Sequence, residues 1–151
     1  MQITGELDLL SAPRFLLFGN GGSASIASHI ANDILKMWER PAFVMDAATM
    51  SCLGNDFGWE RVFEIWLERA QRTEDCVIAI SSSGASKNVV RGCLHAREHG
   101  PLVTLTGFEP NNPVRETGHL NFYVPSKNYG IVETVHLAIL HSIFNPGLIN
   151  G

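Results

Sequence analysis

The sequence lacks any apolar run of the roughly 20 residues that a membrane-spanning helix needs. Positive charge is scarce too, because 11 Lys and Arg stand against 15 Asp and Glu, for a net charge of −4, and no basic run occurs. The first ten residues carry Glu6 and Asp8 where a secretory signal would carry Lys or Arg. These absences exclude a membrane-spanning protein and argue against nucleic-acid binding. We expect a soluble, cytoplasmic protein.

Cysteine is also rare, and its three residues, Cys52, Cys76 and Cys93, show no CxxC spacing. An odd number of separated cysteines predicts neither a disulfide framework nor a cysteine zinc site. We therefore expect three buried thiols. Charged residues make up 17% and apolar residues 45% of the 151 residues, which is typical of a single globular domain over 1–151.

Short apolar runs alternate with amphipathic stretches along the chain. The runs predict buried parallel strands at 15–18, 42–45, 76–80, 102–105 and 120–124. Helical patterns lie at 23–38, 59–71, 86–99 and 130–143, with a shorter segment near 47–53 and a turn at 113–117. The alternation predicts an α/β fold, a three-layer doubly wound sandwich with a five-stranded parallel sheet of flavodoxin-like type. In such sheets ligands bind at the carboxyl ends of the strands.

The loop after the first predicted strand is rich in glycine. It reads Gly19-Asn20-Gly21-Gly22-Ser23-Ala24 and leads directly into a helix. Glycines let the backbone approach a ligand, and the free N–H groups at a helix start favour an anion. The loop also fits the GxGxxA form of the dinucleotide fingerprint, with Asp46 as the ribose-binding acid. A tight turn in which Ser23 caps the helix is a third interpretation.

A second loop of this kind follows the third predicted strand. It reads Ser81-Ser82-Ser83-Gly84-Ala85-Ser86, again between a strand and a helix. Hydroxyls and main-chain N–H groups at a helix N-terminus can hold a phosphate without Lys or Arg. Capping needs only one serine, and a dinucleotide-binding domain does not usually need this second loop. The pair of loops therefore favours a small phosphorylated ligand and no nucleotide cofactor.

Ionisable side chains recur on the first and last predicted helices. His29 and Asp33 are four residues apart and share a helix face. Glu133 and His141 are eight apart, which leaves them on neighbouring faces of the last helix. Two carboxylates and two imidazoles are suitable ligands for one zinc ion and equally suitable as acid and base. His136, between Glu133 and His141, suits a buried core position as well as a functional one.

In combination these motifs resemble the sugar isomerase (SIS) family, in particular its sedoheptulose 7-phosphate isomerase (phosphoheptose isomerase) branch. The resemblance extends from about Arg14 to Phe144. It rests on the glycine loop with His29 after it, on Gly54-Asn-Asp-Phe-Gly58, on the serine loop and on the last helix. It implies an SIS fold and an aldose–ketose isomerase that converts sedoheptulose 7-phosphate into a heptose 7-phosphate by enediol proton transfer.

The resemblance also implies roles for the matching positions. The residues that would bind the substrate and its phosphate are Asn20, Gly21, Ser23, Asp56, Ser81, Ser82, Ser83 and Ser86. The residues that would be catalytic are Asp33, Glu133 and His141. Some members of the family bind zinc through the positions that match His29, Asp33, Glu133 and His141.

The chain departs from the family pattern in two ways. The family's catalytic Glu is replaced by Asp33 and its Gln by Glu133, so one carboxylate is shortened and another is gained. Family chains also begin with a long helical segment, which is largely absent before Arg14. We expect a homo-oligomer, a dimer or tetramer, with active sites between subunits. The alternative is a non-catalytic SIS-type protein that binds a phosphosugar or a regulatory partner.

Overall fold

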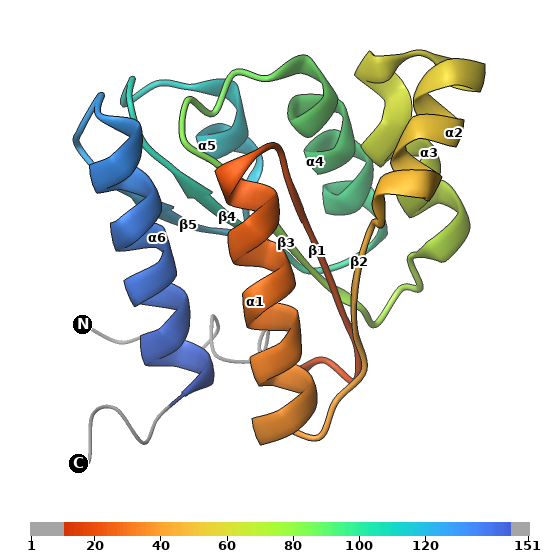
Figure 1. Ribbon diagram of the computed structural model, residues 1–151, viewed down its shortest axis with the longest axis horizontal. Coiled ribbons are helices and arrows are strands. Elements are labelled where there is room, and N and C mark those ends of the chain that lie inside the picture. Colours follow the sequence, from red (N-terminus) through yellow and green to blue (C-terminus); the bar gives the residue numbers. More distant parts are fainter. Residues whose placement is uncertain (1–10, 146–151) are drawn as a thin grey trace.

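The computed structural model describes residues 11–145, which form three layers around one sheet (Figure 1). The sheet is parallel and contains β1 (Phe15–Gly19), β2 (Ala42–Val44), β3 (Cys76–Ser81), β4 (Leu102–Thr106) and β5 (Leu120–Tyr123). Its strand order is β2-β1-β3-β4-β5, so the chain changes direction across the sheet between β2 and β3. This order is the flavodoxin-like form of the doubly wound fold, and it confirms the predicted fold class.

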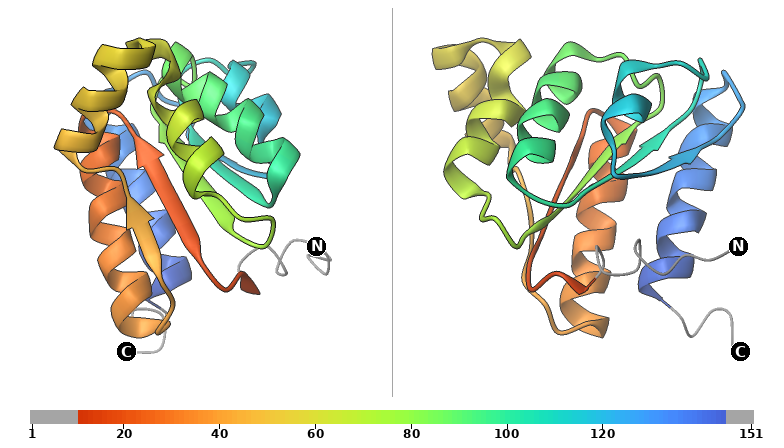
Figure 2. Two further views of the ribbon diagram at one scale, coloured as in Figure 1. Left: turned by 90° about the vertical axis from the view of Figure 1, so that its right-hand side faces the viewer. Right: turned by 180° about the vertical axis from the view of Figure 1, so that it is seen from behind.

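Helices cover both faces of the sheet (Figure 2). One face carries α1 (Gly22–Met37) and α6 (Tyr129–Phe144), which pack side by side. The other face carries α2 (Ala47–Phe57), α3 (Val62–Ala70), α4 (Lys87–His99) and α5 (Pro113–Thr117). A short 3-10 turn, Trp59–Arg61, joins α2 to α3. None of the helices within 11–145 is long and apolar enough to cross a membrane.

Strand β1 shows why the predicted strands are continuously apolar. Successive strand side chains point to opposite faces, and both faces of this sheet are covered. Phe15 and Leu17 pack in the core beneath α1 and α6, whereas Leu16 and Phe18 pack against α3 and α4. All four side chains are buried, and each contributes about 1.5–3 kcal/mol of burial free energy. The sheet is thereby fixed as a rigid platform for the loops at its carboxyl edge.

His136 belongs to the core of the protein. It is fully buried on α6, and its Nε2 lies 3.0 Å from the carbonyl oxygen of Thr106. Burial lowers the pKa of His136, because the charged imidazolium is poorly solvated there. A neutral ring donating from Nε2 fits this setting, so the core interpretation of His136 holds.

Two expectations about α2 and the cysteines are wrong. Cys76 and Cys93 are buried, and burial raises the pKa of each thiol to about 12. Cys52 is exposed, because it lies on the solvent side of α2 beside the inward-facing Leu53. The helix also continues to Phe57 instead of ending near residue 53.

The predicted domain limits of 1–151 include residues 1–10 and 146–151, which lie outside the described part of the chain.

Candidate active site

The glycine loop and the serine loop lie next to each other at the carboxyl edge of the sheet. Strand β1 pairs with β3 so that Gly19 is opposite Ile80, which brings the two following loops together. A Cβ at Gly19 would lie 2.5 Å from the Ile80 carbonyl oxygen, so only glycine permits this approach. Gly84 has a φ of +63°, a left-handed conformation that favours glycine at the turn of the serine loop.

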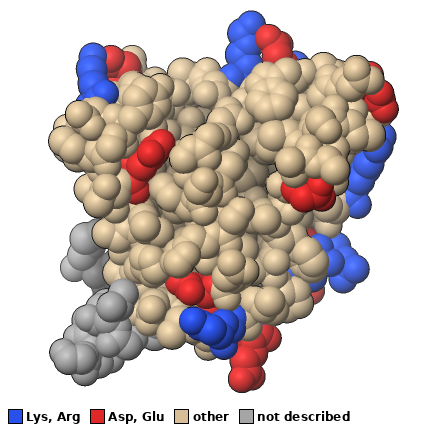
Figure 3. Space-filling model, in the orientation of Figure 1, with Lys and Arg blue, Asp and Glu red and all other residues tan. Residues whose placement is uncertain are grey.

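Between the loops lies a cavity of about 210 Å³. It is lined by Asn20, Gly21, Gly22, Ser23, Ser81, Ser82, Ser83, Ser86, Tyr129 and Glu133. Seven of the eight residues predicted to bind substrate are therefore brought together, and Asp56 is the exception. No Lys or Arg of the described part of the chain lines the cavity, and Figure 3 shows Lys and Arg at the periphery of the face that α1 and α6 present.

The cavity offers hydrogen-bond donors that the protein itself does not use. The Ser82 hydroxyl is buried and has no hydrogen-bond partner within residues 11–145. Ser86 is the N-cap residue of α4 but makes no side-chain capping bond. The N-cap residue of α1 is Gly21, so the interpretation of Ser23 as the cap of this helix is wrong. Two helix N-termini and unoccupied hydroxyls at one cavity are a suitable environment for a phosphate group.

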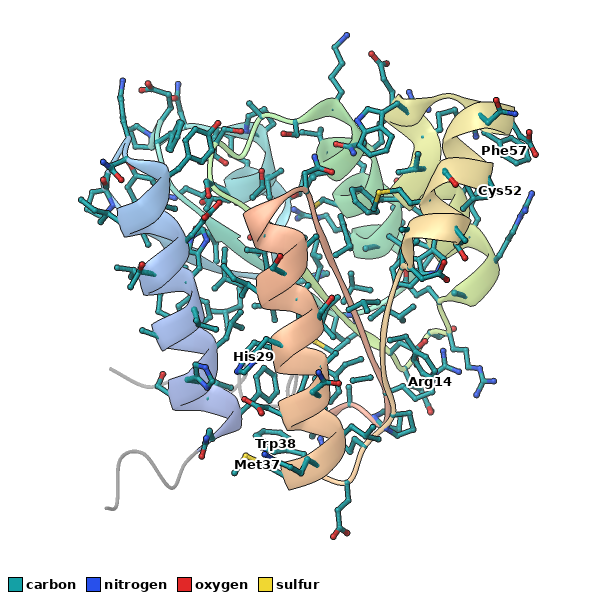
Figure 4. The ribbon with its side chains drawn as sticks, viewed as in Figure 1. Arg14, His29, Met37, Trp38, Cys52 and Phe57 are labelled. Carbon is teal, nitrogen blue, oxygen red and sulfur yellow. The ribbon has the colours of Figure 1, made fainter. Side chains whose placement is uncertain are left out.

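A second group of candidate functional side chains lies in the groove between α1 and α6. Asp33 Oδ2 is 3.6 Å from His29 Nε2 and 3.4 Å from His141 Nδ1. Figure 4 shows His29 between the two helices. The Asp33 oxygen and the His141 nitrogen are buried and form no proper hydrogen bond with any described residue. The three side chains thus converge on one point without satisfying one another.

This geometry fits a zinc ion. One ligand atom from each of His29, Asp33 and His141 lies within 4.8 Å of the other two. Tetrahedral zinc with bonds of about 2.0–2.1 Å separates neighbouring ligand atoms by about 3.4 Å, close to the observed distances. Imidazole nitrogen and carboxylate oxygen are also ligands that zinc commonly takes.

Glu133 stands apart from this group. It precedes His141 by eight residues, which is about 12 Å along the axis of α6. Its carboxylate lies against the first residue of α1, since a Cβ on Gly22 would be 2.5 Å from Oε1. A carboxylate is stabilised there by the helix dipole. Three of the four predicted metal ligands therefore converge within one chain, and metal binding by the fourth, Glu133, stays a prediction.

Comparisons with known proteins identify the family. A family model described as the SIS domain matches residues 9–107. The chain belongs to the SIS family. A curated SIS relative, phosphoheptose isomerase from Aquifex aeolicus, is 35% identical over 135 residues, which cover 85% of this chain and 71% of the relative. The phosphoheptose isomerase of Bradyrhizobium sp. (strain ORS 278) is 36% identical over 139 residues, or 86% of this chain and 69% of the relative.

Solved structures have the same fold as this SIS chain. A phosphoheptose isomerase from Neisseria gonorrhoeae aligns with a TM-score of 0.80 and 26% identity, covering 91% of this chain and 77% of that one. The NanR protein of Vibrio vulnificus, complexed with ManNAc-6P, aligns with a TM-score of 0.70 over 95% of this chain and 51% of that one. At 16% identity, the second likeness shows the fold alone.

Two acids near α2 do not face the cavity of this SIS chain. Asp56 is exposed in the last turn of α2 instead of in a turn between helices, and its carboxylate accepts a hydrogen bond from Asn55. Asp46, the ribose-binding acid of the dinucleotide interpretation, caps α2 by accepting the N–H of Thr49 at 2.9 Å. That N–H lowers the pKa of Asp46. The role of Asp46 in this chain is helix capping.

Sequence reasoning missed two residues of the site. Asn88, in the first turn of α4, forms hydrogen bonds with Asn20 across the cavity wall. Tyr129 lines the cavity from the first turn of α6. A lone Asn and a lone Tyr carry no spacing signal, although both stand within five residues of a predicted functional position.

Proposed function

We propose that this SIS protein is a phosphosugar isomerase that interconverts sedoheptulose 7-phosphate and a heptose 7-phosphate. The observation that carries the proposal is the cavity between the two loops, where two helices begin and the buried Ser82 hydroxyl has no partner among residues 11–145. The relatives named phosphoheptose isomerase support the choice of a heptose phosphate.

The phosphate group is held by the two loops. Main-chain N–H groups at the start of α1 and the hydroxyls of the serine loop supply the donors. The serine hydroxyls that line the cavity belong to Ser23, Ser81, Ser82, Ser83 and Ser86. Fixing the phosphate holds the carbon chain in one orientation and makes the later proton transfer effectively unimolecular.

Proton transfer is the task of the carboxylates and His141. A base removes the proton from the carbon beside the carbonyl, and an acid protonates the neighbouring carbon or its oxygen. Asp33 and Glu133 are the candidate bases, and His141 is the acid. His141 and Asp33 already face each other in the groove, with Nδ1 and Oδ2 3.4 Å apart. Asp56 is proposed as a further polar residue of the active site, although it lies outside the cavity of its own chain.

The complete active site is proposed to lie between two copies of the chain, in a dimer or tetramer. Asp33 is 11 residues beyond Gly22, about 16 Å along α1, and His141 is about 12 Å beyond Glu133 on α6. Within one chain the Glu133 carboxylate lies at the start of α1, outside the group formed by His29, Asp33 and His141. A second copy whose groove faces the cavity would bring all three groups to one substrate.

Zinc is the proposed metal at His29, Asp33 and His141. When bound there, it would supply Lewis-acid polarisation of the carbonyl and enediolate oxygens. A carboxylate or imidazole that coordinates the ion is a poorer proton carrier, so the metal and acid–base roles of Asp33 and His141 compete. Glu133 would serve as the base in a zinc-loaded site, because its carboxylate is not part of the group within one chain.

A non-catalytic phosphosugar-binding protein is the second candidate. One observation favours it: the cavity for the phosphate is complete within one chain, whereas the acid–base groups are separated. Turnover distinguishes the two. We expect the wild-type protein to form an aldose phosphate from sedoheptulose 7-phosphate, and His141→Ala to reduce kcat by about a hundredfold or more. Binding of the phosphosugar by a wild-type protein that gives no product would assign the second function.

A further inference from the structure

We propose that Tyr129 forms an aromatic wall that binds the sugar part of the substrate, and that Phe108 is the residue that positions it. The inference rests on the proposed phosphosugar function and adds a specificity-determining side chain to the same site. No motif of the sequence points to either residue.

Tyr129 is placed as a ligand-binding aromatic would be. It is the first residue of α6 and lines the cavity together with the serine loop and Glu133. Its side chain is 59% exposed, so the ring contributes little to the core. The serines line the cavity from the carboxyl ends of β1 and β3, whereas Tyr129 lines it from α6. The phosphate and the carbon chain of one ligand can therefore contact different walls.

Phe108 has a strained backbone next to this wall. Its φ is +58°, and within residues 11–145 only Glu39 is another non-glycine residue with a positive φ. This conformation is costly for a bulky residue and persists only where its surroundings enforce it. The Phe108 N–H donates to the Ser126 carbonyl at 2.9 Å, and the Phe108 carbonyl accepts the Tyr123 hydroxyl at 2.9 Å.

The strain directs the Phe108 ring at Tyr129. The two rings meet edge to face, with centroids 4.8 Å apart and planes at 66°. Such pairs contribute about 0.5–1.5 kcal/mol beyond the area they bury. The contact limits the positions that the exposed Tyr129 ring can take. A core aromatic would need no such support, because close packing alone would hold it.

The chemistry of a tyrosine suits a sugar chain. The ring face offers an apolar surface for the C–H groups of the sugar, and the phenol O–H donates to or accepts from its hydroxyls. Ligand sites usually combine an apolar wall of this kind with a few placed polar groups. Inorganic phosphate has no C–H groups, so its binding should not depend on this wall.

The experiment compares two ligands by isothermal titration, sedoheptulose 7-phosphate and inorganic phosphate, in wild type, Tyr129→Ala, Tyr129→Phe and Phe108→Ala. Phe43→Ala, which removes an exposed ring on β2, is the matched control. We expect Tyr129→Ala to weaken sugar-phosphate binding about tenfold, equivalent to about 1.4 kcal/mol, and to leave phosphate binding within about twofold. Tyr129→Phe should retain most of the affinity, and Phe108→Ala should fall between.

Each outcome separates this inference from the isomerase function. Equal changes for both ligands in Tyr129→Ala, or no change for either, would overturn the role of the wall. If the wild type turns over the substrate and Tyr129→Ala has an unchanged KM, the role of Tyr129 is contradicted and the isomerase function is not. If the wild type shows no turnover but Tyr129→Ala still weakens only sugar-phosphate binding, the role of Tyr129 is supported and the isomerase function is contradicted.

Discussion

Asn20 and Asn88 exchange two side-chain hydrogen bonds. The Asn20 amide donates to Asn88 Oδ1 at 2.9 Å, and the Asn88 amide donates back to Asn20 Oδ1 at 2.9 Å. Asn88 is 2% exposed, and its Oδ1 also accepts the N–H of Val89. The pair ties the glycine loop to the first turn of α4, and therefore sets the width of the cavity between the two loops.

The first prediction concerns this pair. In Asn88→Asp, the side-chain N–H that donates to Asn20 Oδ1 is replaced by a carboxylate oxygen, which can only accept. We therefore expect a loss of about 1–3 kcal/mol in the free energy of unfolding. KM should rise about tenfold with kcat within about threefold, because the phosphate donors are displaced while the acid–base groups are not. Steady-state kinetics and urea unfolding measure both effects.

Asn111→Asp is the matched control, because Asn111 is exposed and does not line the cavity. A purely structural role for Asn88 would lower stability and leave KM unchanged. The double variant Asn20→Ala with Asn88→Ala should cost less than the sum of the single changes, since either one alone breaks the pair.

The second prediction concerns zinc. We expect one zinc ion per chain. Asp33→Asn and His29→Gln should each weaken zinc binding at least about tenfold, because changes to residues that only hydrogen-bond to metal ligands already have effects of that size. His99→Gln is the matched control, because His99 is an exposed histidine on α4 outside the group of three. Titration of the metal-free protein with zinc alone measures the affinity. Similar zinc affinities in His29→Gln and His99→Gln would show that His29 does not bind zinc and would contradict the proposed site.

The third prediction concerns the assembly. A chain carrying Ser82→Ala with Ser83→Ala has a damaged phosphate cavity, and a chain carrying His141→Ala has a damaged groove. If each active site combines the cavity of one copy with the groove of another, co-expressed chains should recover up to about a quarter of wild-type activity. Mixed oligomers, verified by mass spectrometry, that recover no activity would place the whole site within one chain.

Much of the fold and part of the site follow from local sequence. The predicted strands and helices agree with the structure to within a few residues except for α2, because each carries a strong apolar period. The glycine and serine loops are recognisable as candidate anion sites, because each places glycine or hydroxyl residues at the start of a helix. Their meeting at one cavity follows from the pairing of β1 with β3.

The remaining features depend on tertiary contacts. The sequence predicts a buried Cys52, but a single apolar residue is also common on an exposed helix face, as here on α2. Residue type groups Glu133 with His141, whereas the rise of the helix separates their Cα atoms by about 12 Å. Asn88 contacts Asn20, which lies 68 residues earlier in the chain. Tyr129 contacts Phe108, which lies 21 residues earlier. Spacing within a motif carries no information about such distant contacts.

The central claim is that this chain abstracts a proton beside a ketose carbonyl. The most direct test is proton NMR of sedoheptulose 7-phosphate with the protein in deuterated water, which detects exchange even when net conversion is small. The account predicts deuterium entering at the carbon beside the carbonyl in the wild type, and incorporation slowed about a hundredfold or more with His141→Ala. Binding of the phosphosugar without any deuterium incorporation in the wild type would contradict it.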